Sequence, residues 1–235
     1  MLSMMAKSEF YTEKENGSKH EKFLTYIDKK ISEIEGFKVE FSIVKASYYE
    51  SLDETVEAID ILDDLKTDKA FNNDHRFYLA SLFEKESEYV KATELIEQIL
   101  EVDQKNADAY NFLGYSLVER NESLKKAYEY LQMAISLSPE NGYIRDSLGW
   151  YYFKQGKMKD ALKEMKLAIK LVGNDTAINK HMAIIYTELN DFKNAKAFIK
   201  KALETARTEN DRKELVEALN SLEQKRKPAS FNLKK

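Results

Sequence analysis

Small and apolar residues recur along this chain with a period close to 34 residues. One series has steps of 34 or 35 residues and comprises Leu24, Ala58, Ala92, Ala127, Ala161 and Ala195. A second series of small residues lies upstream, each followed three positions later by an aromatic residue or leucine: Ala46, Ala80, Gly114, Gly149 and Ala183. A fixed period of this length indicates a stacked array of similar units, which presents surfaces to partners.

Each unit carries the pattern of two helices. In the clearest unit, 107–139, Tyr110, Leu113 and Leu117 lie on one face of a first helix. Leu124 to Leu137 predicts the second helix, with Ala127 on its inner face. Small residues at positions 114 and 127 allow the two backbones to approach closely. The sequence therefore predicts an array of antiparallel helix hairpins.

The period also predicts the organisation of the chain. Five hairpins are expected at about 37–70, 71–105, 106–140, 141–173 and 174–206. Residues 1–36 predict an incomplete hairpin, whose helices lie within 2–13 and 18–35. A capping helix is expected at 209–226, begun by Asn210 or Asp211, and a disordered tail at 227–235.

The unit resembles the tetratricopeptide repeat, which has a leucine–glycine pair, then tyrosine, two later alanines and a closing proline. The matching residues of the third hairpin are Tyr110, Leu113, Gly114, Leu117, Ala127, Leu131, Ala134 and Pro139. Two departures are Lys45, where leucine is expected, and Gly173, where the fourth hairpin lacks the proline. The resemblance covers about 37–204 and implies an all-α fold, a right-handed α-solenoid of antiparallel helix hairpins.

The central stretch narrows this resemblance. The sequence LGYSL at 113–117, followed by DSLGW at 146–150, is similar to a pair found in bacterial envelope repeat proteins. Some of those are outer-membrane lipoproteins that deliver substrates to a carboxy-terminal processing protease. That role implies that the chain is a fragment of a longer protein, in the periplasm or at the outer membrane. As written, the chain carries no export address and points to the cytoplasm.

Composition limits the class of partner. The net charge of −4 and the pI near 5.6 do not favour nucleic-acid binding, which needs a clustered basic face. No run of apolar residues approaches the length of a membrane span, and the absence of cysteine excludes disulfides. Met1, Leu2, Met4, Met5 and Phe10 predict an uncapped apolar end, which indicates either a longer native protein or a homo-oligomer through this end.

In the family that the repeat resembles, the first helix of each hairpin lines a concave groove. The register then gives a set of candidate partner-binding residues: Phe77, Ser81, Asn111, Tyr115, Tyr143, Asp146, Trp150, Phe153, Lys180 and Ile184. Two interpretations stay open for Trp150 and Tyr115. Either they are exposed anchors for a partner, or they pack against neighbouring helices across the groove.

Catalytic and metal-binding patterns are not found. His20, His75 and His181 lie in different units, and none has a second histidine at metal-ligand spacing. No glycine-rich phosphate loop or nucleophile elbow occurs, so we expect no enzyme, no cofactor and no metal. The sequence predicts a scaffold or adaptor whose groove binds a peptide or partner helix. The alternatives are a regulatory subunit that binds a small molecule and the envelope adaptor described above.

Overall fold

The computed structural model describes residues 17–34 and 36–226, and every regular element within those ranges is a helix. None of these helices is long and apolar enough to cross a membrane. The predictions for the helix within 2–13, for its uncapped apolar end and for the tail at 227–235 concern residues outside the described ranges.

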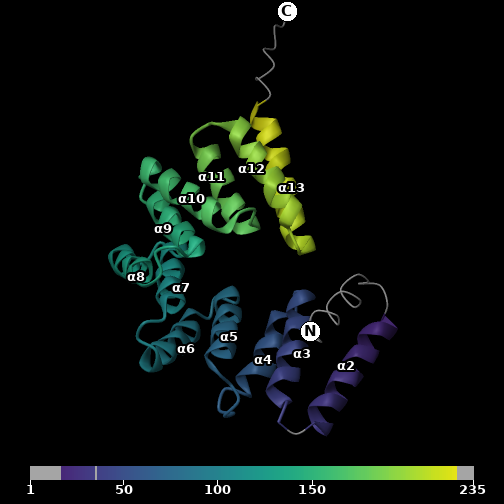
Figure 1. The fold of residues 1–235 in the computed structure, drawn as a ribbon. Helices are drawn as coiled ribbons and strands as arrows, with labels where there is room; N and C mark the ends of the chain where they lie inside the picture. Colours follow the sequence, from purple (N-terminus) through teal and green to yellow (C-terminus); the bar gives the residue numbers. More distant parts are fainter. Residues whose placement is uncertain (1–16, 35, 227–235) are drawn as a thin grey trace, which may run out of the picture. The chain divides into compact units, whose positions relative to one another are not determined.

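The chain divides into two compact units, Met1–Gln104 and Lys105–Lys235. The described helices of the first unit are α2 (Gly17–Glu33), α3 (Lys38–Ser51), α4 (Thr55–Asp63), α5 (Asn73–Lys85) and α6 (Tyr89–Val102) (Figure 1). Those of the second are α7 (Ala107–Glu119), α8 (Leu124–Leu137), α9 (Gly142–Lys154), α10 (Met158–Val172), α11 (Thr176–Glu188), α12 (Phe192–Thr205) and α13 (Glu209–Arg226).

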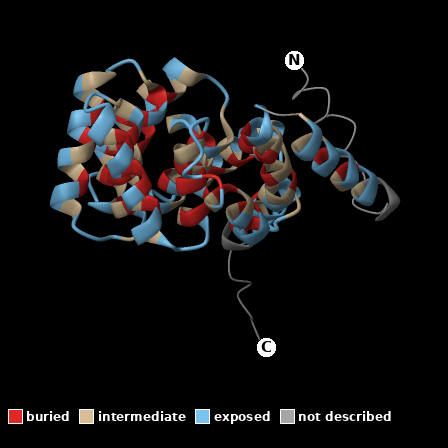
Figure 2. Cartoon of the chain, turned by 90° about the horizontal axis from the view of Figure 1, so that it is seen from below, coloured by how far each residue is buried: buried red, intermediate tan, exposed pale blue. Residues whose placement is uncertain are grey.

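Consecutive helices pack as pairs because small residues face each other across each pair. A Cβ atom added to Gly114 in α7 would lie 2.8 Å from Leu131 Cγ in α8, and one added to Gly149 in α9 would lie 3.3 Å from the carbonyl oxygen of Ala161 in α10. The contact leaves no room for a larger residue. Figure 2 shows buried residues along the inner faces of the helices and exposed residues on their outer faces.

Apart from Ser123, which directly precedes α8, the turn inside each pair contains one residue in the left-handed backbone region. These residues occupy equivalent places in the repeat: Asp53, Ser87, Asn121, Gly156 and Asn190. Such a conformation costs little for glycine and is tolerated by asparagine and aspartate. The turn is therefore a second feature, besides the small residues, that follows the period of the sequence.

The first helices of the second unit begin at side-chain caps. Asn106, Asn141 and Asp175 accept hydrogen bonds from backbone amides in the first turns of α7, α9 and α11. These caps satisfy donors that have no partner within the helix. The α4 helix is shorter than the sequence pattern indicates, because it ends at Asp63. The apolar Leu65 of the repeat pattern is still buried, but it lies in the turn that follows the helix.

Candidate functional site

The second unit contains a cavity of about 780 Å³ lined by side chains from α7, α9, α11 and α13. Contacts join α7 to α9 and α9 to α11, so the first helices of successive pairs form one continuous wall. Five of the candidate groove residues line this cavity, which we call the inner cavity: Tyr115, Tyr143, Trp150, Lys180 and Ile184. The register of the repeat therefore brings these side chains together.

The other candidate residues lie elsewhere. Phe77 and Ser81 belong to α5 in the first unit, where Phe77 is partly buried and Ser81 is exposed. Asn111 is partly buried on α7 and is not among the residues that line the inner cavity. Asp146 and Phe153 are on α9 and contact residues of the cavity wall from behind.

Trp150 is packed into the wall. It is 6% exposed, and its ring stacks on His181 at 4.2 Å between centroids and on Phe153 at 4.7 Å. Its indole N–H donates a hydrogen bond to Glu119 of α7. The interpretation of Trp150 as an exposed anchor is therefore wrong. The ring packs against neighbouring helices because α11 places an imidazole on one of its faces.

His181 and Asp146 form a buried pair that joins α11 to α9. The imidazole Nδ1 lies 2.9 Å from both carboxylate oxygens, and His181 is 9% exposed. Because a carboxylate only accepts hydrogen bonds, Nδ1 carries the proton in this pair. The ring is thereby held in one orientation, with Trp150 against its face.

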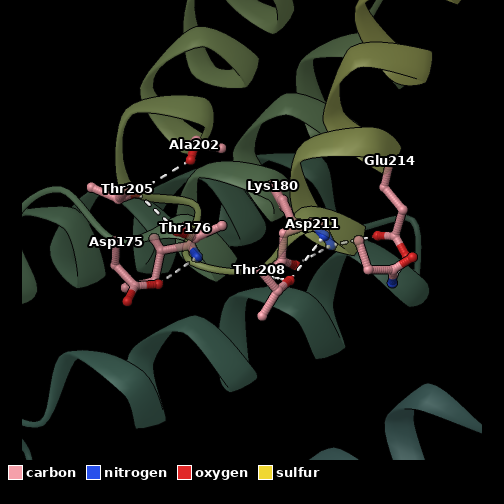
Figure 3. Close-up of polar contacts among 10 residues, drawn as sticks. Asp175, Thr176, Lys180, Ala202, Thr205, Thr208, Asp211 and Glu214 are labelled. Atoms are coloured by element: carbon pink, nitrogen blue, oxygen red, sulfur yellow. Dashed lines mark hydrogen bonds and ion pairs between the residues drawn. The ribbon is translucent and has the colours of Figure 1, made fainter. Parts of the chain in front are cut away.

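Ion pairs attach the capping helix to the wall of the inner cavity. Lys180 of α11 lies 2.8 Å from Glu214 and 3.6 Å from Asp211, both on α13. Figure 3 shows these contacts, with Thr208 donating to Asp211 at 2.8 Å. In the same view the Thr176 hydroxyl donates to Thr205 at 2.9 Å. These contacts hold the C-terminal end of the cavity together.

Sequence reasoning missed part of the cavity wall. Glu119 ends α7, Asp175 caps α11 and Arg207 lies between α12 and α13, so these positions fall outside the register used for the groove. His181 lies on α11 but one position away from that register. Asp146 lies about one repeat before His181. A search of the sequence for complementary side chains at the repeat spacing could therefore have identified this pair.

A second, smaller cavity of about 380 Å³ lies between α11, α12 and the capping helix. Apolar side chains form most of its wall, including Ala183, Ile199, Leu215 and Leu222. Lys180 and Ile184 line both cavities. In the part of the chain that the structure describes, no three histidine, aspartate or glutamate residues are grouped as metal ligands.

The family model of the tetratricopeptide repeat matches residues 181–209, which contain most of the α11–α12 pair. The paired helices and their packing recur through both units. These features and the family match support a protein of the tetratricopeptide repeat family. Among curated tetratricopeptide repeat proteins, PA4667 of Pseudomonas aeruginosa is 32% identical over 89 residues, which is 38% of this chain and 15% of that protein. MJ1428 of Methanocaldococcus jannaschii is 27% identical over 121 residues, 52% of this chain and 21% of that protein.

Solved tetratricopeptide repeat structures share the all-α fold of this chain. TTC0263 of Thermus thermophilus gives a TM-score of 0.66 at 19% identity, covering 77% of this chain and 98% of that one. A tetratricopeptide repeat protein of Parabacteroides merdae gives 0.71 at 18% identity, covering 86% and 79%. At sequence identities of 18–19%, the similarity to these structures shows the fold alone. Tetratricopeptide repeat proteins are in general non-catalytic scaffolds that bind other proteins.

Proposed function

We propose that this tetratricopeptide repeat protein is a non-enzymatic scaffold whose inner cavity binds an extended segment of a partner protein. The observation that carries the proposal is the cavity itself, because side chains from three successive first helices and the capping helix meet there. A concave site of this kind, with a few apolar side chains and fixed polar groups, suits recognition of a peptide.

Two exposed apolar side chains supply the contacts for an anchor. Tyr143 is 53% exposed and Ile184 is 44% exposed, and both line the inner cavity. Large apolar side chains that stay exposed in a concave surface are typical of binding sites, since their burial against a partner is favourable.

The wall behind these residues is held in place before any partner binds. Trp150 is fixed between His181 and Phe153, and its indole N–H is bound by Glu119. Lys180 is held by two carboxylates of α13. A site whose side chains are already ordered loses less conformational entropy on binding, which favours affinity.

The polar groups of the wall support binding better than catalysis. Asp146 and His181 form two members of a hydrolytic triad, but no serine or threonine hydroxyl is recorded within hydrogen-bond distance of His181 among the described residues. Their pairing instead links α9 to α11 and orients the ring against Trp150.

The proposal is tested by selecting peptides from a displayed random library on the whole chain. Ile184→Asp places a charge in the inner cavity, and we expect it to weaken binding of the selected peptides at least about tenfold. Met133→Asp is the matched control, because Met133 is 45% exposed on α8 and lies outside the cavity. Peptides that bind both variants as tightly as the unmodified chain would contradict the proposal.

A second candidate function is the binding of a small apolar ligand in the smaller cavity. Its volume of about 380 Å³ and its apolar wall fall within the range of small-molecule sites. A thermal-shift screen of a metabolite library tests it, because a ligand that binds the native state raises the melting temperature. Ala218→Leu on α13 fills this cavity and should abolish the shift, whereas a shift that persists in this variant argues against the site.

A further inference from the structure

We infer that the segment held in the inner cavity carries a basic side chain, lysine or arginine, at the position that enters the cavity. This inference rests on the proposed function and adds the chemistry of the partner. Its basis is the inventory of charges, hydrogen-bond acceptors and aromatic rings that the wall leaves for a ligand.

The charge of the wall favours a cation. Six carboxylates line the cavity or contact its wall directly: Glu119, Asp146, Asp175, Glu204, Asp211 and Glu214. Three cations meet the same criterion, since Lys180 and Arg207 line the cavity and the Lys154 ammonium lies over the Trp150 ring. Six carboxylates against three cations leave a formal charge of −3 with His181 neutral. Lys180 already lies between Asp211 and Glu214, so its own charge offers little to an acidic ligand.

Two carboxylates of the wall offer acceptor oxygens to a ligand. Glu119 uses Oε1 for the indole N–H of Trp150, and Asp175 uses Oδ1 for the amide of Ile178. The second oxygen of each carboxylate has no hydrogen bond recorded in the described part of the chain. A lysine ammonium or an arginine guanidinium presents only donors and complements such a set.

His181 supplies a further acceptor. Its Nδ1 donates to Asp146 and one ring face is covered by Trp150, which leaves the Nε2 edge as the polar part of the ring that lines the cavity. Nε2 has no hydrogen-bond partner recorded among the described residues. In the neutral ring with the proton on Nδ1, Nε2 is an acceptor and complements a donor from the ligand.

Aromatic rings add a second kind of attraction for a cation. Tyr143 and Tyr115 both line the cavity, and Tyr143 is the more exposed of the two. A cation over an aromatic face is attracted by the negative charge of the ring face, and the attraction grows as the cation is desolvated. Arg207 is the opposing feature, because it lines the same cavity, is exposed and has no recorded partner within the described ranges.

The test uses three pools of nine-residue synthetic peptides, degenerate at every position except the centre. The central residue is lysine, norleucine or glutamate, so the pools differ in charge at one position. We expect the lysine pool to bind the whole chain about tenfold more tightly than the norleucine pool, and the glutamate pool to bind most weakly. Higher salt should reduce the difference, because salt screens the charges.

Matched variants test whether the preference for the lysine pool comes from the carboxylates of the cavity wall. Glu119→Gln with Asp175→Asn removes two charges while keeping an acceptor for the indole and a capping side chain for α11. It should weaken binding of the lysine pool about tenfold. Glu129→Gln with Glu140→Gln removes two exposed charges of the same unit outside the cavity and should leave binding within about twofold. Arg207→Gln should preserve or strengthen binding of the lysine pool.

The outcomes separate this inference from the proposed function. If Ile184→Asp weakens binding of the pools, but the glutamate pool binds as tightly as the lysine pool or more tightly, the inference is overturned and the proposed scaffold function still stands. Loss of lysine-pool binding in Arg207→Gln also overturns it. If no pool shows binding that Ile184→Asp removes, the proposed function fails and the inference fails with it.

Discussion

Leu148 in α9 and Lys45 in α3 occupy the same position in their repeats, directly before the small residue at the helix contact. Leu148 is buried among apolar side chains that include Met165 and Met182. Lys45 is partly buried, and its ammonium lies 2.6 Å from Asp28 of α2. The same repeat position therefore makes apolar contacts in one repeat and an ion pair with the preceding helix in the other.

The two repeats also differ at their helix ends. α9 begins at Asn141, whose side chain accepts from two backbone amides, whereas α3 begins after Phe37 without a side-chain cap. α10 has 15 residues and α4 has 9. The repeat geometry thus tolerates the loss of several local features, as long as the small residues at the helix contact remain. Each difference leads to a paired measurement.

The largest expected effect is the difference in stability between truncating Leu148 and truncating Lys45. Leu148→Ala removes a buried side chain and should lower the free energy of opening of α9 by about 2–5 kcal/mol. Lys45→Ala, at the equivalent position, should lower that of α3 by no more than about 1 kcal/mol, because it removes an ion pair whose aspartate is 54% exposed. Native-state hydrogen exchange of the two helices measures both, and equal losses would refute the comparison.

The contact between α9 and α10 should resist enlargement. Ala161 is fully buried against Gly149, so Ala161→Leu forces the helices apart and should cost about 1–3 kcal/mol. Ala197→Leu on the exposed face of α12 is the control and should change stability by less than about 0.5 kcal/mol. Urea unfolding followed by the fluorescence of Trp150, the only tryptophan, reports on this unit. An Ala161→Leu variant as stable as the control would show that the contact is loose.

The helix caps give a smaller difference. Asn141→Ala leaves the amides of Tyr143 and Ile144 without their acceptor and should cost about 0.5–2 kcal/mol, again followed by Trp150 fluorescence. Asn141→Ser keeps an acceptor and should recover most of the loss. At the equivalent position of α3, Phe37→Ala should change the exchange of that helix by less than about 0.5 kcal/mol. A larger loss at Phe37 would mean that its exposed ring stabilises α3 by packing.

The helix pairs could be predicted from the sequence because the features that define them are local. Gly149 and Ala161 lie within one hairpin, and the second helix predicted from Leu124 to Leu137 has those bounds in the structure. The cavity was predictable only in part. Lys180 and Ile184 line it because they follow the register, whereas the pair of Asp146 and His181 depends on how one repeat packs on the next. The interior position of Trp150 has the same origin.

The smallest expected effect concerns the ion pair that replaces apolar packing in α3. Lys45→Met keeps most of the side chain and removes the charge, Asp28→Asn removes the partner charge, and the double variant completes a cycle. We expect a coupling energy of about 0.2–1 kcal/mol at low salt, because Asp28 is 54% exposed. In 1 M salt the coupling should fall toward zero, since the Debye length is then about 3 Å. The destabilisation by Leu148→Ala contains no electrostatic contribution and should be the same at both salt concentrations. Hydrogen exchange of α3 and α9 at low salt and in 1 M salt therefore tests whether the two repeats differ in this way. A coupling that survives 1 M salt would show that Lys45 and Asp28 interact through a desolvated contact, and the two repeats would then differ less than their sequences indicate.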